Sequence, residues 1–153
     1  MDHLDRFSRR ILHELQIDSR VTTQDLAQRV GLSATPCWRR IKDLEARGII
    51  QRYTVLLDRE KLGLAACFLA NVTLIRHNRS AVEEFERAVA SYSEVVECYS
   101  ATGDADYVLK IVMSDTRAYY EFLQSKVFKL SAVANIRTMV VLREIKYETA
   151  LPV

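Results

Sequence analysis

The sequence predicts an α+β chain of two domains, an N-terminal winged helix-turn-helix and a C-terminal ferredoxin-like βαββαβ domain. Two short amphipathic segments joined by a glycine indicate the first domain. A change of hydrophobic period near residue 66, followed by alternating strand-like and helix-like segments, indicates the second. We expect the first domain over residues 1–53, a linker strand or hinge over 54–66, and the second domain over 67–153.

The bulk composition is that of a globular protein. The 153 residues have room for one ordinary domain or two small ones, and 49% hydrophobic and 27% charged residues are ordinary values. No window approaches the roughly 18 apolar residues of a membrane span, and the N-terminus lacks the apolar region of a secretory signal. Three widely spaced cysteines argue against a disulfide framework or a zinc site. We therefore expect a cytoplasmic, nucleoid-associated protein with no membrane partner and no metal.

Two amphipathic helices are expected before residue 31. Their apolar positions recur at helical spacing, and an Asp or Thr that can cap the first turn precedes each. The first helix begins at Asp2 or Asp5 and has its apolar face at Leu4, Ile11, Leu12 and Leu15. The second is capped by Thr22 or Thr23 and has its apolar face at Leu26, Ala27 and Val30.

A third helix follows the turn at Gly31. Ser33 is its expected N-cap, whose side chain accepts a first-turn amide, and Pro36 falls in the turn that tolerates proline. Gly48 stands where a left-handed C-cap is expected, and the β-branched residues 49–56 after it suit a short β-wing. Helical spacing gives this helix an apolar face of Cys37, Ile41 and Leu44, and an opposite face of Thr35, Trp38, Arg39 and Lys42 flanked by Arg40 and Arg47.

The charge of this region favours DNA binding. Residues 29–52 hold six Lys or Arg against two Asp or Glu, a local balance of +4, whereas the whole chain carries +2. The second helix of a helix-turn-helix enters the major groove, although a basic helix face can also be merely solvated. Trp38 either meets DNA, at a sugar or a thymine methyl, or packs on the neighbouring helix. The expected DNA-binding residues are Ser33, Thr35, Pro36, Trp38, Arg39, Arg40, Lys42 and Arg47.

The second half alternates strands and helices in the order βαββαβ. Strands are expected at 67–75, 95–101, 107–113 and 135–147, with a turn at 102–106. One helix opens with a capping box of Ser80 and Glu83, and the other is capped by Asp115. Their apolar stripes are Val82, Phe85, Val89 and Tyr92, and Tyr119, Phe122, Leu123 and Val127. The two helices cover one face of the sheet and leave the other face exposed. We therefore expect two copies to dimerise through that face, which would also bring two DNA-binding domains together.

Nearly end to end, the chain resembles the leucine-responsive/asparagine-regulator (Lrp/AsnC) family of small prokaryotic transcription factors. Two places depart from the family pattern: Trp38-Arg39 on the recognition face, and residues 130–133 where relatives often have Leu-Pro-Gly-Val. The motifs that carry the resemblance are Leu4-Asp5-Arg6, Ile11-Leu12, Gly31-Leu32-Ser33, Thr35-Pro36-Cys37, Arg40-Ile41, Leu44-Glu45, Gly48-Ile49-Ile50, Val96-Glu97-Cys98, Gly103-Asp104, Asp106-Tyr107 and Arg137-Thr138.

The resemblance implies an effector-binding second domain of the RAM type that also drives oligomerisation. It implies a homodimer that assembles into tetramers or octamers, binds double-stranded DNA and takes up a free amino acid between dimers. It places the effector at Tyr99, Ser100, Thr102, Gly103, Asp104 and Asp106 on one side and Thr138, Met139 and Val140 on the other. Without the resemblance, the sequence favours an ordinary hairpin turn with solubilising acids at residues 103–106, and the resemblance reverses that preference. Met139 and Val140 favour leucine or methionine as effector, and no other cofactor is expected.

Two alternatives differ in function. An architectural protein would coat or bend DNA with little ligand response, but the near-neutral net charge argues against it. An enzyme is not expected, because His3, His13 and His77 are scattered and only four glycines exist, too few for a phosphate-binding loop. The identity of the effector, activation or repression, the target genes and the size of the assembly stay open.

Overall fold

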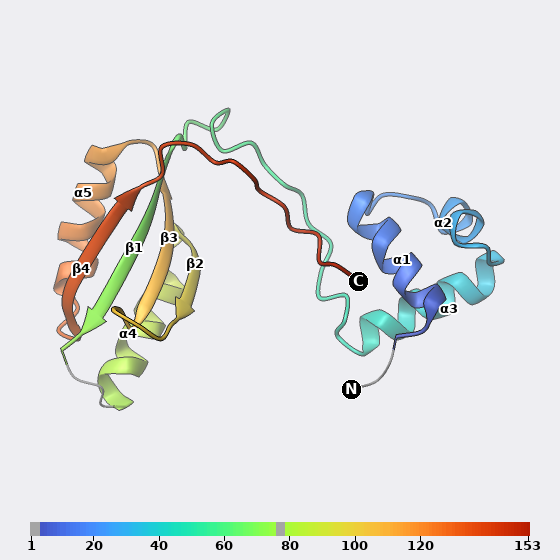
Figure 1. Cartoon of the computed structure of the whole chain (residues 1–153), viewed down its shortest axis with the longest axis horizontal. Helices are drawn as coiled ribbons and strands as arrows, with labels where there is room; N and C mark the ends of the chain where they lie inside the picture. The colour runs from blue at the N-terminus through green and yellow to red at the C-terminus, as the bar shows by residue number, and fades with distance from the viewer. Residues whose placement is uncertain (1–3, 76–78) are drawn as a thin grey trace. The chain divides into compact units, whose positions relative to one another are not determined.

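The computed structural model describes residues 4–75 and 79–153, so Asp2, His3 and His77 lie outside the described residues. The chain forms two compact units, Met1–Leu56 together with Lys146–Val153, and Leu57–Ile145. Each is described by itself (Figure 1). Of the helices described, none has the length and apolar character that crossing a membrane requires.

The first unit contains the three expected helices, α1 (Arg6–Ile17), α2 (Thr23–Val30) and α3 (Ala34–Ala46). Asp5 caps α1, since its Oδ1 accepts the Ser8 amide at 2.8 Å. Thr22 caps α2, with its Oγ1 accepting the Asp25 amide at 3.1 Å. Both caps satisfy amides that the helix itself leaves without an acceptor, and this is why the helices begin where they do.

The three helices enclose one small core. Two polar contacts also join α1 to α2. Arg29 forms an ion pair with Glu14 at 3.2 Å, and the Arg10 side chain donates a hydrogen bond to the Arg29 carbonyl at 2.6 Å. The apolar faces expected from the sequence are confirmed. The buried residues are Ile11, Leu12, Leu26, Ala27, Val30, Cys37, Ile41 and Leu44.

The expected β-wing is not formed as a strand. Ile49 and Ile50 lie in a bend in which both amides donate to Leu44 O, and residues 51–56 belong to no helix or strand. Val55 and Leu56 are 74% and 61% exposed. A strand needs a hydrogen-bonding neighbour, and β-branched composition alone does not supply one. Tyr53 ties the segment to α3, since its hydroxyl donates to Glu45 Oε1 at 3.0 Å. The prediction of a strand here was therefore wrong for the single chain.

The second unit is a four-stranded antiparallel sheet with helices α4 (Arg79–Ser91) and α5 (Thr116–Ser125) on one face (Figure 1). The strands are β1 (Ala66–Leu74), β2 (Val95–Ser100), β3 (Tyr107–Met113) and β4 (Val133–Val140), and a 3₁₀ turn η1 (Val127–Lys129) follows α5. Their order in the sheet is β2-β3-β1-β4. This is the ferredoxin-like βαββαβ arrangement, and it confirms the α+β class.

The largest differences from the expected boundaries are the end of the last strand and the start of α4; the other strand ends differ by one or two residues. The last strand ends at Val140 rather than continuing to residue 147, because β1 offers it partners only as far as Phe68. Helix α4 begins at Arg79, so Ser80 lies inside it, and the Glu83 carboxylate takes the Arg79 guanidinium at 2.7 Å instead of closing a capping box. The Asp115 cap is confirmed, with its Oδ1 accepting the Ala118 amide at 2.8 Å.

Side chains alternate between the two faces of the sheet along each strand. We call the face that α4 and α5 cover the closed face, and the opposite one the open face. Phe68, Leu109 and Ile111 point to the helices and are buried, and Phe68 stacks on Tyr119 with ring centroids 4.0 Å apart. The opposite face is half-buried and mixed in character. It contains Leu69, Asn71, Thr73, Val108, Lys110 and Val112.

Candidate DNA-binding and effector sites

One side of helix α3 is buried in the core of the first unit, and the opposite side is exposed to solvent. Its inward face is occupied by Cys37, Ile41 and Leu44, which are 0%, 8% and 0% exposed. Gly31, at φ +77° with its amide bonded to Gln28, makes the sharp turn out of α2. A left-handed backbone costs a glycine little, so this residue allows two short helices to share one core. The other side of α3 is consequently left for a partner.

The start of α3 is exposed and polar. Ser33 occupies the N-cap position with extended backbone, but its side chain makes no capping bond, so that predicted bond was wrong. Thr35 and Pro36 beside it are exposed. Helix N-termini carry free amides and a partial positive charge, which favour phosphate oxygens. The Ser33 hydroxyl and these amides are therefore candidates to bind a phosphate oxygen of DNA.

The four basic residues of the recognition region differ in their surroundings. Lys42 pairs with Glu45 at 2.6 Å, and Arg47 pairs with Asp43 at 3.1 Å. Both are exposed pairs within one helix, which water and salt open easily. Arg39 is exposed, and no ion pair or hydrogen bond involves its side chain among the described residues. It is the residue of the group most available to a phosphate.

Arg40 is bound within the protein. Its Nη1 forms an ion pair with Asp5, reaches Ser8 Oγ at 3.4 Å, and its guanidinium lies over the Phe7 ring at 5.6 Å. The side chain joins α3 to the cap of α1. In the structure Arg40 therefore positions the recognition helix, and its predicted DNA contact stays a prediction.

Trp38 stands on the outward side of α3. It is 54% exposed, so its ring is not buried against a neighbouring helix. Of the two roles that the sequence left open, the exposure favours an outward one. An exposed indole on a basic face suits contact with a sugar or a thymine methyl.

The turn between β2 and β3 holds two carboxylates with different roles. Asp106 is part of the scaffold: its Oδ2 accepts the Leu74 amide at 2.8 Å and its own amide donates to Val72 O at 2.9 Å. Asp104 is exposed. Gly103 has φ +122°, a conformation that other residues rarely adopt. Of the two carboxylates, Asp104 is the better candidate for an ammonium group.

The two halves of the expected effector site do not meet in one chain. The turn is tied to β1 at Val72 and Leu74, whereas Met139 pairs with Leu69 and Val140 with Phe68. At about 3.3 Å per residue, three to six residues of strand separate these positions along β1, a distance of roughly 10–20 Å. A pocket that uses both groups therefore needs a second copy of the chain.

The remaining effector candidates point to opposite faces. Thr138 faces the helices, with its Oγ1 2.5 Å from the Tyr119 hydroxyl, while Met139 is 51% exposed on the other side. Tyr99 lies on the open face, and its hydroxyl donates to Glu97 at 2.9 Å. Ser100, next in the strand, points to the helix face.

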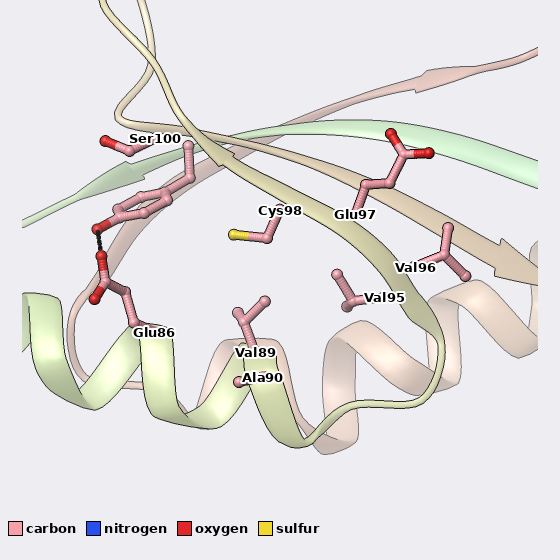
Figure 2. Close-up of a pocket in the computed structure, with 9 residues that line it drawn as sticks. Glu86, Val89, Ala90, Val95, Val96, Glu97, Cys98 and Ser100 are labelled. Atoms are coloured by element: carbon pink, nitrogen blue, oxygen red, sulfur yellow. Dashed lines mark hydrogen bonds between the residues drawn. The ribbon is translucent and has the colours of Figure 1, made fainter. Parts of the chain in front are cut away.

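A hollow of about 290 Å³ lies between α4 and β2 (Figure 2). Its walls include Val89, Val95 and Cys98, and the Tyr107 hydroxyl donates to Glu86 Oε1 at 2.7 Å. Burial and the Glu86 carboxylate raise the pKa of Tyr107 to about 12, so the phenol stays a proton donor. Sequence reasoning missed this hollow; only the alternation of β2 against the α4 stripe could have indicated it. Among the described residues, no cluster of His, Cys, Asp and Glu could hold a metal ion.

Each of the two domains matches a known protein family. Residues 4–51 match a winged helix-turn-helix DNA-binding model, and residues 67–151 match the Lrp/AsnC ligand binding domain. The leucine-responsive regulatory protein of Escherichia coli is 40% identical over 148 residues, which cover 97% of this chain and 90% of that protein.

Two solved structures have the same fold. The AsnC family transcriptional regulator of Agrobacterium tumefaciens is 38% identical, with a TM-score of 0.93 and 97% of each chain covered. A transcriptional regulator of Neisseria meningitidis, solved with L-methionine, is 35% identical, with a TM-score of 0.94 and 98% of this chain and 97% of that chain covered.

A helix-turn-helix joined to a ligand-binding domain defines the class: a ligand-responsive transcriptional regulator that binds DNA. The chain belongs to the Lrp/AsnC family of such regulators. The family predicted from the sequence is thereby confirmed.

Proposed function

We propose that this protein is an amino-acid-responsive, sequence-specific regulator of transcription, not an enzyme, that acts as a homo-oligomer on double-stranded DNA. The observation that carries the proposal is the exposed outer side of α3, where Trp38 is half exposed and Arg39 has no partner among the described residues, in a chain that also has a ligand-binding domain. Phosphate contacts by Arg39, Lys42 and Arg47 would set affinity, and residues near Ser33, Thr35 and Pro36 would read base edges. A cytoplasmic location stays a prediction.

The effector site that we propose is completed by two copies of the chain. Asp104 and the amides of the turn would take the ammonium and carboxylate of a free amino acid. Met139 and Val140 of a second copy would supply an apolar wall, since one chain separates the two groups along β1. The methionine complex of the Neisseria regulator supports an apolar effector such as methionine or leucine.

Thermal unfolding against the twenty amino acids tests this proposal. A ligand at one hundred times its Kd should stabilise the folded state by about 2.7 kcal/mol, which raises the midpoint clearly. We expect L-methionine or L-leucine to raise it, and Asp104→Asn to abolish the shift while the ligand-free midpoint is unchanged. A flat response to all twenty, with DNA binding retained, would instead support an architectural protein.

A further inference from the structure

The outer side of α1 (Figure 1) holds four basic side chains that the recognition helix does not explain. Their spacing of three and four residues places them on one side of the helix, opposite the buried Ile11 and Leu12. All four are exposed to solvent. We call this set the α1 stripe, and it consists of Arg6, Arg9, Arg10 and His13.

Acidic side chains of the described residues do not neutralise the arginines of the α1 stripe. Arg9 Nε donates to Leu4 O at 3.2 Å. Arg10 Nη2 donates to Arg29 O at 2.6 Å. Carbonyl acceptors hold these two side chains without cancelling their charge, and the third arginine of the stripe makes no ion pair or hydrogen bond within the described part of the chain. The one acid within α1, Glu14, is paired with Arg29 at 3.2 Å.

The stability of α1 does not account for these charges. The beginning of a helix carries a partial positive charge that disfavours cations, and the first turn of α1 holds no acid. Arg6 also has a like-charged neighbour three residues away and another four residues away, which is unfavourable on a helix. The cap residue Asp5 is already paired with Arg40. Arginines that local electrostatics opposes indicate a charged partner outside the domain.

The α1 stripe and the outer side of α3 lie on different sides of the first unit. Both helices turn their apolar sides toward the same core, so their outer sides point away from it in different directions. Toward the end of α1 the stripe stops at Gln16, which donates to Leu151 O at 3.0 Å and accepts the Leu151 amide at 2.6 Å. The stripe is therefore a bounded surface in the first half of α1, separate from the recognition face.

We propose that the α1 stripe is a second DNA-binding surface, which binds the phosphate backbone of DNA outside the stretch that contacts α3. Charge complementarity selects this partner, because guanidinium groups bind phosphate through paired N–H donors and a duplex carries one negative charge per about 1.7 Å of its axis. The four side chains extend over about 10 Å of helix, which suits a short run of phosphates. Phosphate contacts carry no sequence information, so this surface adds affinity without adding specificity.

A pair of substitutions in the stripe tests the proposal. Arg6→Gln with Arg9→Gln removes two positive charges and keeps residues that favour helix, and the same two positions changed to Lys keep the charge. The matched control, Arg87→Gln with Arg117→Gln, removes two charges from exposed positions of α4 and α5. Binding to random-sequence duplexes of about 16 and about 60 base pairs, roughly one and a half and six helical turns, is measured by fluorescence anisotropy over a salt series.

On the longer duplex, the slope of log K against log salt should become shallower by about 2 in the Gln pair, since two phosphate contacts are lost. On the shorter duplex the change should be smaller, because little DNA extends beyond the stretch at α3. The Lys pair and the control should keep the slope of the unaltered protein. The midpoint of thermal unfolding should not fall in the Gln pair, because the substitutions relieve repulsion between like charges.

Three results would overturn the proposal. An unchanged slope in the Gln pair would leave the stripe for an acidic protein surface instead of DNA. An equal loss in the control would reduce the effect to net charge alone. An equal loss on both duplexes would place the stripe against the DNA that contacts α3. Failure of the proposed function differs from all three, because the unaltered protein would then show neither a preferred sequence nor a response to an amino acid, while its salt slope on random DNA could still be measured.

Discussion

At the scale of single residues, two adjacent arginines of α3 have different roles. Arg40 joins Asp5, Ser8 and Phe7 of the first helix, whereas Arg39 points to solvent. The helical spacing places Arg39 on the basic face and Arg40 beside it. Their different roles become visible only from the residues that each contacts in the folded structure. A basic residue that already has a partner inside the protein gains less from a phosphate.

Arg39→Ala should weaken binding to every DNA sequence and leave the fold intact. Loss of one phosphate contact should reduce the slope of log K against log salt by about 1. The change in unfolding free energy should stay within about 0.5 kcal/mol, as for most surface substitutions. Salt titration of DNA binding by fluorescence anisotropy, with thermal unfolding alongside, measures both. An unchanged slope would remove Arg39 from the interface.

The Asp5 cap makes part of the stability depend on pH. The Ser8 amide, together with Arg40, holds the pKa of Asp5 below its usual value of 3.8. A carboxylate with a lowered folded pKa stabilises the protein above its unfolded pKa, and this contribution disappears as the pH falls through the folded value. Asp5→Asn should therefore cost about 0.2–1 kcal/mol at pH 7 and progressively less as the pH falls below 3.8 and through the folded pKa of Asp5.

Urea unfolding across pH 2–7 measures the Asp5 effect. Arg39→Met is the control, since its side chain lies away from the cap, and its difference from the unaltered protein should not follow the same curve. A difference for Asp5→Asn that is constant over this whole range would contradict the assignment.

At the scale of elements, the turn between α2 and α3 needs a glycine because of its backbone conformation and not because a side chain would lack room there. Gly31 has φ +77°, and a Cβ built there would meet no atom within 4 Å. Gly31→Ala should therefore destabilise by about 1–2 kcal/mol through strain alone. Gly31→Asn should cost less, since Asn tolerates this region. Equal midpoints for the alanine variant and the unaltered protein in chemical unfolding would refute the strain argument.

At the scale of the whole molecule, the open face of the sheet is the surface that we propose for dimerisation. Its middle is apolar at Leu69, Val108 and Val112, and Lys110 is paired with Glu97 at 3.3 Å. Such a face, half-buried in one chain, gains stability when a second copy covers it. Dimerisation would also bring two recognition helices onto one DNA site.

Leu69→Glu should weaken dimerisation by more than about tenfold, since an unpaired charge in an apolar interface costs several kcal/mol. Tyr120→Glu places the same charge on the exposed outer side of α5 and should leave the assembly unchanged. Sedimentation velocity over a dilution series measures both. An unaltered dimer in Leu69→Glu would place the interface on another surface.

Much of the fold could be predicted because local physical rules are strong. The caps at Asp5, Thr22 and Asp115 and the apolar face of α3 follow from helix geometry and appear as expected. Residues 49–56 and the end of β4 were mispredicted, because a strand exists only where another strand pairs with it. The pairing of Arg40 with Asp5 could not be predicted either, since the two residues are 35 positions apart in the sequence.

The order of the elements, their buried faces and the family could be predicted from the sequence alone, because capping, periodicity and motif spacing are short-range properties of the chain. Three features needed the packed fold: that Arg39, alone among the four basic residues of the recognition region, has no ion pair among the described residues, that the two proposed halves of the effector site are separated along β1, and that Gln16 holds Leu151. Each of these depends on contacts between residues distant in sequence, and such contacts exist only once the core has packed.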